Sequence, residues 1–251
     1  MSVFVLVVLG FVQGVCEFLP ISSSGHLVLL SRLFGIEDSL FLSILLHVAT
    51  LLAVIVVMRK EIFYLIRHPF SKESISLMLA TISTCVVAIV FMPFITSSFE
   101  GAVLPIFFLL SAVILFITGR KGNQKGDISY KRAIIVGLAQ GFAIFPGLSR
   151  SGTTIFAGMV SGAGREESSK FSFLISLPII VGSLLMEIYK IIVRGEVVSG
   201  NPLGICLSFL VAFLVGVVGI KFMFKISNNA TFKYFSIYLI VIAIISAILL
   251  W

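Results

Sequence analysis

Long apolar runs, separated by short polar stretches, make up nearly the whole chain. A helix that crosses a bilayer needs about 20 predominantly apolar residues. Six stretches fit that length and are predicted to span a membrane: roughly 40–58, 74–95, 102–119, 168–189, 203–222 and 233–250. The pattern predicts an all-α polytopic protein that forms a single membrane domain over residues 1–251.

Two further apolar stretches, 2–34 and 133–162, are interrupted in the middle by proline and polar residues. In the first, Pro20 lacks an N–H and should end a helix. Ser22 is then a good N-cap for a second helix that begins near Ser23. Each stretch is predicted to form a re-entrant hairpin, because non-helical backbone at membrane depth is tolerated only where protein or a wet cavity covers it.

The two interrupted stretches resemble each other. Gln13-Gly14 matches Gln140-Gly141, and Ser-Ser-Ser-Gly at 22–25 matches Ser-Arg-Ser-Gly at 149–152. Three predicted spans, an odd number, separate the two hairpins. The repeats are therefore predicted to be inverted, with tips that can meet near the bilayer midplane, and broken helices in corresponding halves point to a site at the repeat interface.

Basic residues gather on one side of the predicted membrane. Fourteen of the eighteen Lys and Arg residues fall on that side, three fall on the other, and Arg150 lies inside the second hairpin. By the positive-inside rule the basic side is cytoplasmic, so both termini and the mouth of the first hairpin are predicted to be extracytoplasmic. The loop at 119–129 separates repeats of approximately 1–118 and 130–251.

The composition agrees with a membrane protein. Hydrophobic residues make up 59% of the chain and charged residues 12%, whereas about 25% of a soluble domain is charged. The net charge of +7 follows from the basic loops and does not require nucleic acid. The three cysteines lie in separate apolar segments, which excludes a disulfide framework or a zinc motif.

Ionisable side chains gather at the two breaks. A charged side chain at the bilayer centre costs about 2.5–3.5 kcal/mol on insertion scales, so it is a functional candidate by default. The first break carries Gln13, Glu17, the three serines and His26, and Gln13 and Glu17 share one helix face because they are four residues apart. The second break carries Arg150.

These residue types suit phosphoryl transfer, which depends mostly on positioning and charge neutralisation. Two half-helix N-termini form an anion site, and the planar fork of Arg150 fits phosphate oxygens. Glu17 can bind a divalent cation or act as a base. His26 can act as base, acid or nucleophile, and Ser23 or a neighbouring serine offers a hydroxyl nucleophile.

The segments Gln-Gly-Val-Cys-Glu-Phe-Leu-Pro-Ile-Ser-Ser-Ser-Gly-His and Pro-Gly-Leu-Ser-Arg-Ser-Gly-Thr-Thr resemble the two signature motifs of the undecaprenyl-diphosphate phosphatase family, the bacitracin-resistance membrane phosphatases. The resemblance covers nearly the whole chain. It implies hydrolysis of undecaprenyl diphosphate to undecaprenyl phosphate and inorganic phosphate, which recycles the lipid carrier for cell-wall synthesis and confers bacitracin resistance. It also implies a divalent cation, Mg²⁺ or Ca²⁺, and a site that opens outside the bacterial plasma membrane.

The resemblance also assigns residues and partners. It implies Glu17, Ser23, His26 and Arg150 as catalytic residues, with Glu17 also as the metal ligand. The substrate-binding residues are then Gln13, Ser149, Arg150, Ser151 and Thr154. Many members of the family have glutamate at the position of Gln13, which leaves Glu17 as the only carboxylate on its helix. The partners expected are a polyprenyl diphosphate and membrane lipids, without nucleic acid, and a homodimer is left open.

Several alternatives stay open at this point. Inverted repeats and broken helices also occur in transporters and flippases, and fold does not fix function. An intramembrane serine protease is less favoured because the Gly-x-Ser-x-Gly spacing is missing. Glu17 and Arg150 could form a purely structural ion pair, and His47 is interpreted as a helix-packing hydrogen bond. The nucleophile could be Ser23, His26 or water.

Overall fold

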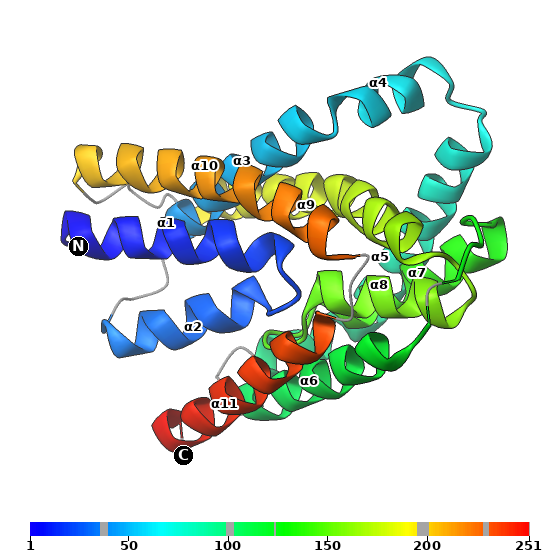
Figure 1. The fold of residues 1–251 in the computed structure, drawn as a ribbon. Coiled ribbons are helices and arrows are strands. Elements are labelled where there is room, and N and C mark those ends of the chain that lie inside the picture. Colours follow the sequence, from blue (N-terminus) through cyan, green and yellow to red (C-terminus); the bar gives the residue numbers. More distant parts are fainter. Residues whose placement is uncertain (36–39, 99–102, 123, 195–200, 228–230, 251) are drawn as a thin grey trace.

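The computed structural model describes residues 1–35, 40–98, 103–122, 124–194, 201–227 and 231–250. Within these ranges the chain forms eleven helices, and its only β pairing is an isolated bridge between Gly126 and Ala163. The helices, shown in Figure 1, are α1 (Val3–Phe18), α2 (Ser23–Leu33), α3 (Leu40–Val57), α4 (Arg59–Arg67), α5 (Lys72–Ser98), α6 (Leu104–Arg120), α7 (Tyr130–Phe142), α8 (Arg150–Val160), α9 (Arg165–Arg194), α10 (Pro202–Ser227) and α11 (Phe232–Leu250). The prediction of an all-α protein is confirmed.

The six predicted spans coincide with α3, α5, α6, α9, α10 and α11, and the helix ends differ from the predicted ones by at most five residues. Four of these helices, α5, α9, α10 and α11, are long and apolar enough to cross a membrane. A fifth candidate arises if α3 and α4, which are bent by 79° at their junction, count as one broken span. The chain is therefore a multi-pass membrane protein, and the exact number of six spans stays a prediction.

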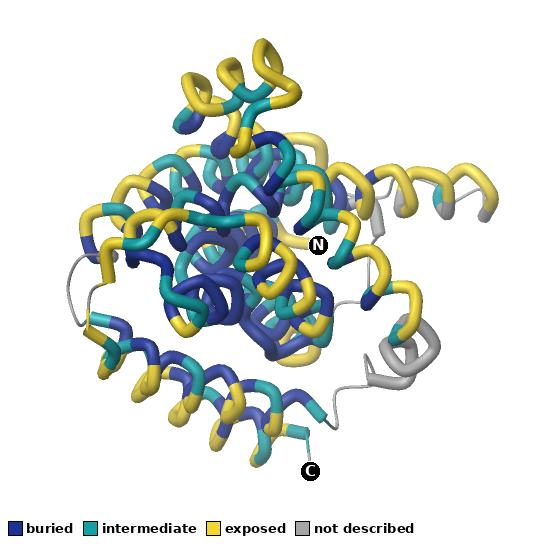
Figure 2. The backbone as a smooth tube through the Cα atoms, turned by 90° about the vertical axis from the view of Figure 1, so that its right-hand side faces the viewer, coloured by how far each residue is buried: buried dark blue, intermediate teal, exposed yellow. Residues whose placement is uncertain are grey.

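The predicted cytoplasmic loop at 59–73 contains the helix α4. Apolar side chains at 62, 63, 65 and 66 recur at helical spacing, which gives the segment an amphipathic pattern. Phe63, Tyr64 and Ile66 are exposed, and α4 stands away from the body of the protein (Figures 1 and 2). An apolar face beside basic residues is typical of a helix that lies at a membrane surface.

Both interrupted stretches fold as helix, break and helix, as predicted. The first break separates α1 from α2 and contains Pro20, and the second separates α7 from α8 and contains Pro146. Ser149 caps α8, because its Oγ accepts a 3.1 Å hydrogen bond from the Gly152 N–H. Ser22 takes the N-cap position of α2 but makes no capping bond there, since its backbone adopts a positive φ of 69°. The predicted position of the cap is correct, but the capping hydrogen bond expected from Ser22 is absent.

Glycines let the first helix of each pair approach a long helix closely. On α1, a Cβ at Gly10 would lie 2.3 Å from the Ser208 carbonyl oxygen of α10. On α7, a Cβ at Gly137 would lie 2.2 Å from the Ala80 carbonyl oxygen of α5. Small residues at membrane helix contacts allow such backbone approach. These contacts hold α1 and α7 in fixed positions, and with them the two breaks.

The helices of the two halves are packed against each other reciprocally. Helix α1 lies along α10, and α7 lies along α5. In the same way α3 contacts α10, while α9 contacts α5. The dark blue, buried segments in Figure 2 lie at the centre of the molecule. The largest buried apolar cluster includes Phe18 of α1, Leu29 of α2, Ile155 of α8 and Phe173 of α9. The broken ends of both stretches therefore reach the interior of the protein.

Candidate functional site: a buried Glu–Arg pair between two broken helices

The two breaks meet at a cavity of about 180 Å³. The cavity lies among α1, α2, α3, α8 and α9 and the segment 143–149. Its polar lining comes from residues of both matched motifs and from two further helices: Glu17, Ser22, Ser23, Ser24, His47, Ser149, Arg150, Ser151 and Ser183. Residues that are more than a hundred positions apart in sequence thus share one polar chamber inside an apolar protein.

The Glu17 carboxylate is at the centre of the polar contacts. Its Oε2 accepts a 2.6 Å hydrogen bond from the Ser23 hydroxyl and a 3.2 Å hydrogen bond from the Gln13 amide. Its Oε1 forms an ion pair with the Arg150 guanidinium. Only 2% of the Glu17 side chain is exposed, compared with 24% of the Arg150 side chain. The carboxylate is therefore fully engaged, while the guanidinium still faces the cavity.

Arg150 is held at the first turn of α8. The Ser149 N–H donates a 2.8 Å hydrogen bond to the Ser111 hydroxyl of α6, which in turn donates to the Gly147 carbonyl at 3.0 Å. The Ser151 hydroxyl donates to the Leu19 carbonyl at 3.3 Å and so joins the two breaks. The N-terminus of α8, with its partial positive charge, and Arg150 therefore face the same cavity.

Three of the predicted site residues, Gln13, His26 and Thr154, lie outside the cavity lining. The His26 Nδ1 donates to the Ser22 carbonyl at 2.8 Å, and its Nε2 is 2.7 Å from the Tyr238 hydroxyl of α11. The Thr154 side chain is fully buried, and its Oγ1 lies 2.6 Å from the Ser172 hydroxyl and 2.9 Å from the Arg150 carbonyl. His26 and Thr154 contact the backbone of residues that line the cavity. His26 contacts Ser22, whose φ is positive, and Thr154 contacts the carbonyl of Arg150.

His47 lines the cavity, although the sequence was interpreted as giving it a helix-packing bond. Its Nδ1 donates to the Ser43 carbonyl one turn earlier on α3, at 2.8 Å. That bond places the proton of a neutral ring on Nδ1 and leaves Nε2 as an acceptor. A signal was available in the sequence, because Ser43 and His47 are two polar residues four apart, on one face of an otherwise apolar helix.

The donor set suits a hard cation that also binds phosphate. Among the described residues there is no group of three or more His, Cys, Asp or Glu side chains that could hold a metal ion by themselves. The Gln13 Oε1 is buried and has no hydrogen-bond partner, so an oxygen donor is left over beside Glu17. Mg²⁺ is commonly held by one or two carboxylates together with substrate phosphates and water. The residues fit such a shared site and do not fit an all-protein cage.

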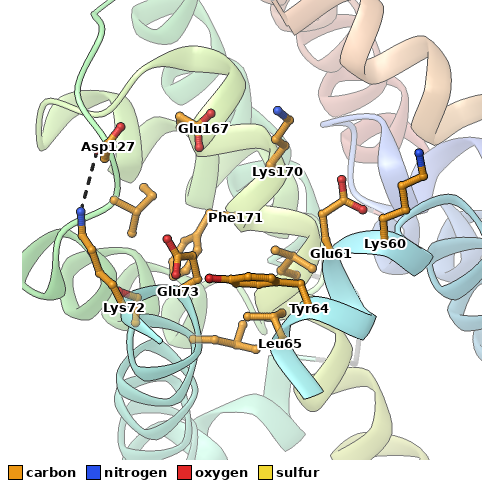
Figure 3. A pocket seen from close by; sticks show the side chains of 14 residues that line it. Lys60, Glu61, Tyr64, Leu65, Lys72, Glu73, Asp127, Glu167, Lys170 and Phe171 are labelled. Carbon is orange, nitrogen blue, oxygen red and sulfur yellow. Dashed lines mark ion pairs between the residues drawn. The ribbon is translucent and has the colours of Figure 1, made fainter. Parts of the chain in front are cut away.

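A larger cleft of about 560 Å³ lies elsewhere, between α4, α5 and the start of α9 (Figure 3). None of the predicted site residues lines it. Its charges are mixed, and the Lys72–Asp127 ion pair at 3.9 Å crosses one edge. The smaller cavity, rather than this cleft, combines buried ionisable groups with the two broken helices.

These features define a polytopic membrane protein with an internal cavity, partly lined by polar side chains, between two broken helices. The chain belongs to the family described as bacitracin resistance protein BacA, whose model matches residues 6–245. It is 40% identical over 249 residues to the undecaprenyl-diphosphatase of Thermosipho africanus, covering 96% of this chain and 97% of that protein. It is 35% identical over 250 residues to the undecaprenyl-diphosphatase of Carboxydothermus hydrogenoformans, covering 97% and 96%, and 38% identical over 252 residues to that of Parabacteroides distasonis, covering 95% and 94%.

Proposed function

We infer that this protein is an undecaprenyl-diphosphatase. It hydrolyses undecaprenyl diphosphate to undecaprenyl phosphate and inorganic phosphate, returns the lipid carrier to cell-wall synthesis and contributes to bacitracin resistance. The observation that carries this function is the Glu17–Arg150 pair with Ser23 beside it, built from both motifs of a BacA-family chain. A purely structural ion pair would not require a cavity at the guanidinium.

Phosphate release from undecaprenyl diphosphate by the purified protein in detergent tests this function. Hydrolysis needs no sealed compartment, whereas a transporter or flippase needs one, so the assay separates the two classes. Steady phosphate release is expected from the wild-type protein and not from Glu17→Gln. The assignment would be overturned if phosphate were released with none of the divalent cations tested.

The proposal gives each of the site residues a role. The diphosphate takes the place of the Glu17 carboxylate as the partner of Arg150, with further contacts to Ser149 and Ser151 at the start of α8. This exchange frees the Glu17 carboxylate next to the Ser23 hydroxyl. Gln13 keeps the carboxylate oriented, and Thr154 and His26 fix the backbone on either side of the cavity.

Ser23 is favoured over His26 as the nucleophile. The Ser23 hydroxyl already donates to a carboxylate, which is the arrangement of a nucleophile with its base. Both ring nitrogens of His26 are engaged away from the cavity. In the resulting scheme the Ser23 oxygen attacks the terminal phosphorus, the bond to the bridging oxygen breaks, and the proton passes to Glu17. Water then hydrolyses the phosphoserine.

A divalent cation, Mg²⁺ or Ca²⁺, is part of the proposal. Glu17 would hold it, with the Gln13 carbonyl oxygen as a second donor and substrate oxygens completing the shell. When bound, the cation would neutralise charge on the diphosphate. The single carboxylate makes this a weak site before substrate binds.

The membrane arrangement also belongs to the proposal. Six spans and two re-entrant hairpins in an inverted repeat place both termini and the mouth of the site outside the bacterial plasma membrane. The reciprocal packing of α1 on α10 and α7 on α5 supports the inverted repeat. The basic loops support the orientation. A homodimer stays an untested expectation.

A further inference from the structure

The imidazole of His47 lines the same cavity as Glu17, Ser23 and Arg150. It comes from α3, whereas the other three residues belong to α1, α2 and α8. The hydrogen bonds described for its ring are made by Nδ1 alone, to the carbonyl and the hydroxyl of Ser43 at 2.8 and 3.5 Å. His47 is half-buried, and the described residues offer its Nε2 no hydrogen-bond partner. This nitrogen is therefore free to bind a molecule in the cavity.

Helix α3 holds the His47 ring in a fixed position. The bond from Nδ1 to the Ser43 carbonyl orients the ring, and Ile44 packs with Ile180 and Leu184 of α9 in one buried cluster. Ile180 also lines the cavity, so this turn of α3 is held against the α9 wall. Because the proton of the neutral ring is on Nδ1, Nε2 carries a lone pair and accepts hydrogen bonds.

A free acceptor is what the charged groups of the site do not provide. Arg150 and the N–H groups at the start of α8 only donate, and the Glu17 carboxylate already accepts from Ser23 and pairs with Arg150. A water molecule that attacks phosphorus directs a lone pair at it and must donate its O–H to an acceptor. Ser24 directly follows Ser23 on α2, whereas the attacking water and the leaving serine oxygen lie on opposite sides of phosphorus. His47 supplies an acceptor from a different helix.

We propose that His47 holds the water molecule that hydrolyses the phosphoserine formed at Ser23. The inference rests on the proposed function and on Ser23 as the nucleophile. The His47 Nε2 accepts a hydrogen bond from this water and so directs its lone pair at phosphorus. The bond between the water oxygen and phosphorus forms, the bond from phosphorus to the Ser23 oxygen breaks, and that oxygen takes back its proton from Glu17. Both water protons stay on the released phosphate, so the step needs no further base.

The test follows a single turnover of undecaprenyl diphosphate labelled at its terminal phosphorus, quenched in acid. In His47→Leu we expect labelled phosphoserine to accumulate and phosphate release to slow about tenfold, because the water loses its acceptor, while undecaprenyl phosphate still forms at the wild-type rate. His47→Gln should restore phosphate release, since its amide oxygen also accepts a hydrogen bond. His68→Leu is the matched control, because His68 is exposed and does not line the cavity.

The outcomes separate this role of His47 from the function itself. Wild-type levels of phosphoserine in folded His47→Leu overturn the proposal, as does an accumulation that His47→Gln does not relieve. If His47→Leu does not fold, His47→Ala replaces it, with the same expected and opposing results. Phosphate release without phosphoserine in any variant would overturn both Ser23 as nucleophile and the role of His47. Failure of the wild-type protein to release phosphate would instead overturn the proposed function.

Discussion

The Ser23 hydroxyl and the Glu17 carboxylate form a 2.6 Å hydrogen bond across the break between α1 and α2. The two residues are six positions apart, and the bend at Pro20 brings them together. Because Arg150 pairs with the other carboxylate oxygen, one buried acid links a hydroxyl from one motif to a guanidinium from the other. Both motifs therefore contribute side chains to one cluster of polar contacts.

Ser23→Ala should abolish formation of a phosphoserine and lower kcat by roughly 1,000-fold, because the nucleophile is removed. Ser24→Ala is the control, since Ser24 also lines the cavity but has no contact with Glu17 among the described hydrogen bonds. Acid-quenched reactions with terminally labelled substrate would be examined by peptide mass spectrometry. Turnover without any labelled Ser23 peptide would indicate direct attack by water.

Arg150→Lys should lower kcat/KM roughly 100-fold while the protein folds normally, because an ammonium cannot form the bidentate fork with phosphate oxygens. Arg120→Lys serves as the control, as Arg120 ends α6 and its guanidinium packs over Phe116. Near-native turnover of Arg150→Lys would mean that Arg150 is only a counter-ion for Glu17.

His47→Leu should lower kcat about tenfold or more and leave the melting temperature nearly unchanged, since the ring lines the cavity and its described hydrogen bonds go only to its own helix. His26→Leu should instead lower the melting temperature, because it removes the contacts to Ser22 and Tyr238. Steady-state kinetics and thermal unfolding of both variants check this contrast. The reverse pattern would indicate that His26, and not His47, takes part in the reaction.

Removal of divalent cations with a chelator should stop phosphate release, and Mg²⁺ or Ca²⁺ should restore it. Gln13→Glu should lower the cation concentration needed for half-maximal activity, because it adds a second carboxylate one helical turn from Glu17. Cation titrations of activity measure both effects. An unchanged midpoint in Gln13→Glu would place the cation away from this helix.

Gly10→Ala should destabilise the protein by about 1–3 kcal/mol, because the new methyl group would lie 2.3 Å from the Ser208 carbonyl oxygen and would push α1 away from α10. Gly182→Ala is a matched control on α9, where nothing lies within 4 Å of the added Cβ. That variant should be neutral or slightly stabilising, because alanine is a better helix former. Thermal unfolding in detergent compares the two variants, and an equal effect would contradict the close packing of α1.

The sequence by itself determined the helices, the two breaks and the central ionisable residues. Its apolar runs are as long as the helices they form, Pro20 and Pro146 lie beside polar residues at the two breaks, and a charged residue such as Glu17 or Arg150 stands out against apolar neighbours. These properties are local, so no tertiary contact is needed to infer them. The segment 59–73 was the exception. Its basic residues predicted a loop, whereas residues 59–67 form the short amphipathic helix α4.

Only the tertiary structure decided which side chains face the cavity. Helical spacing gives the face of a helix, but it does not say which neighbour covers that face. Tyr238 of α11 turns His26 away from the site, and the packing of α3 brings His47 into it. These contacts join distant parts of the chain, and so no pattern within one segment could reveal them.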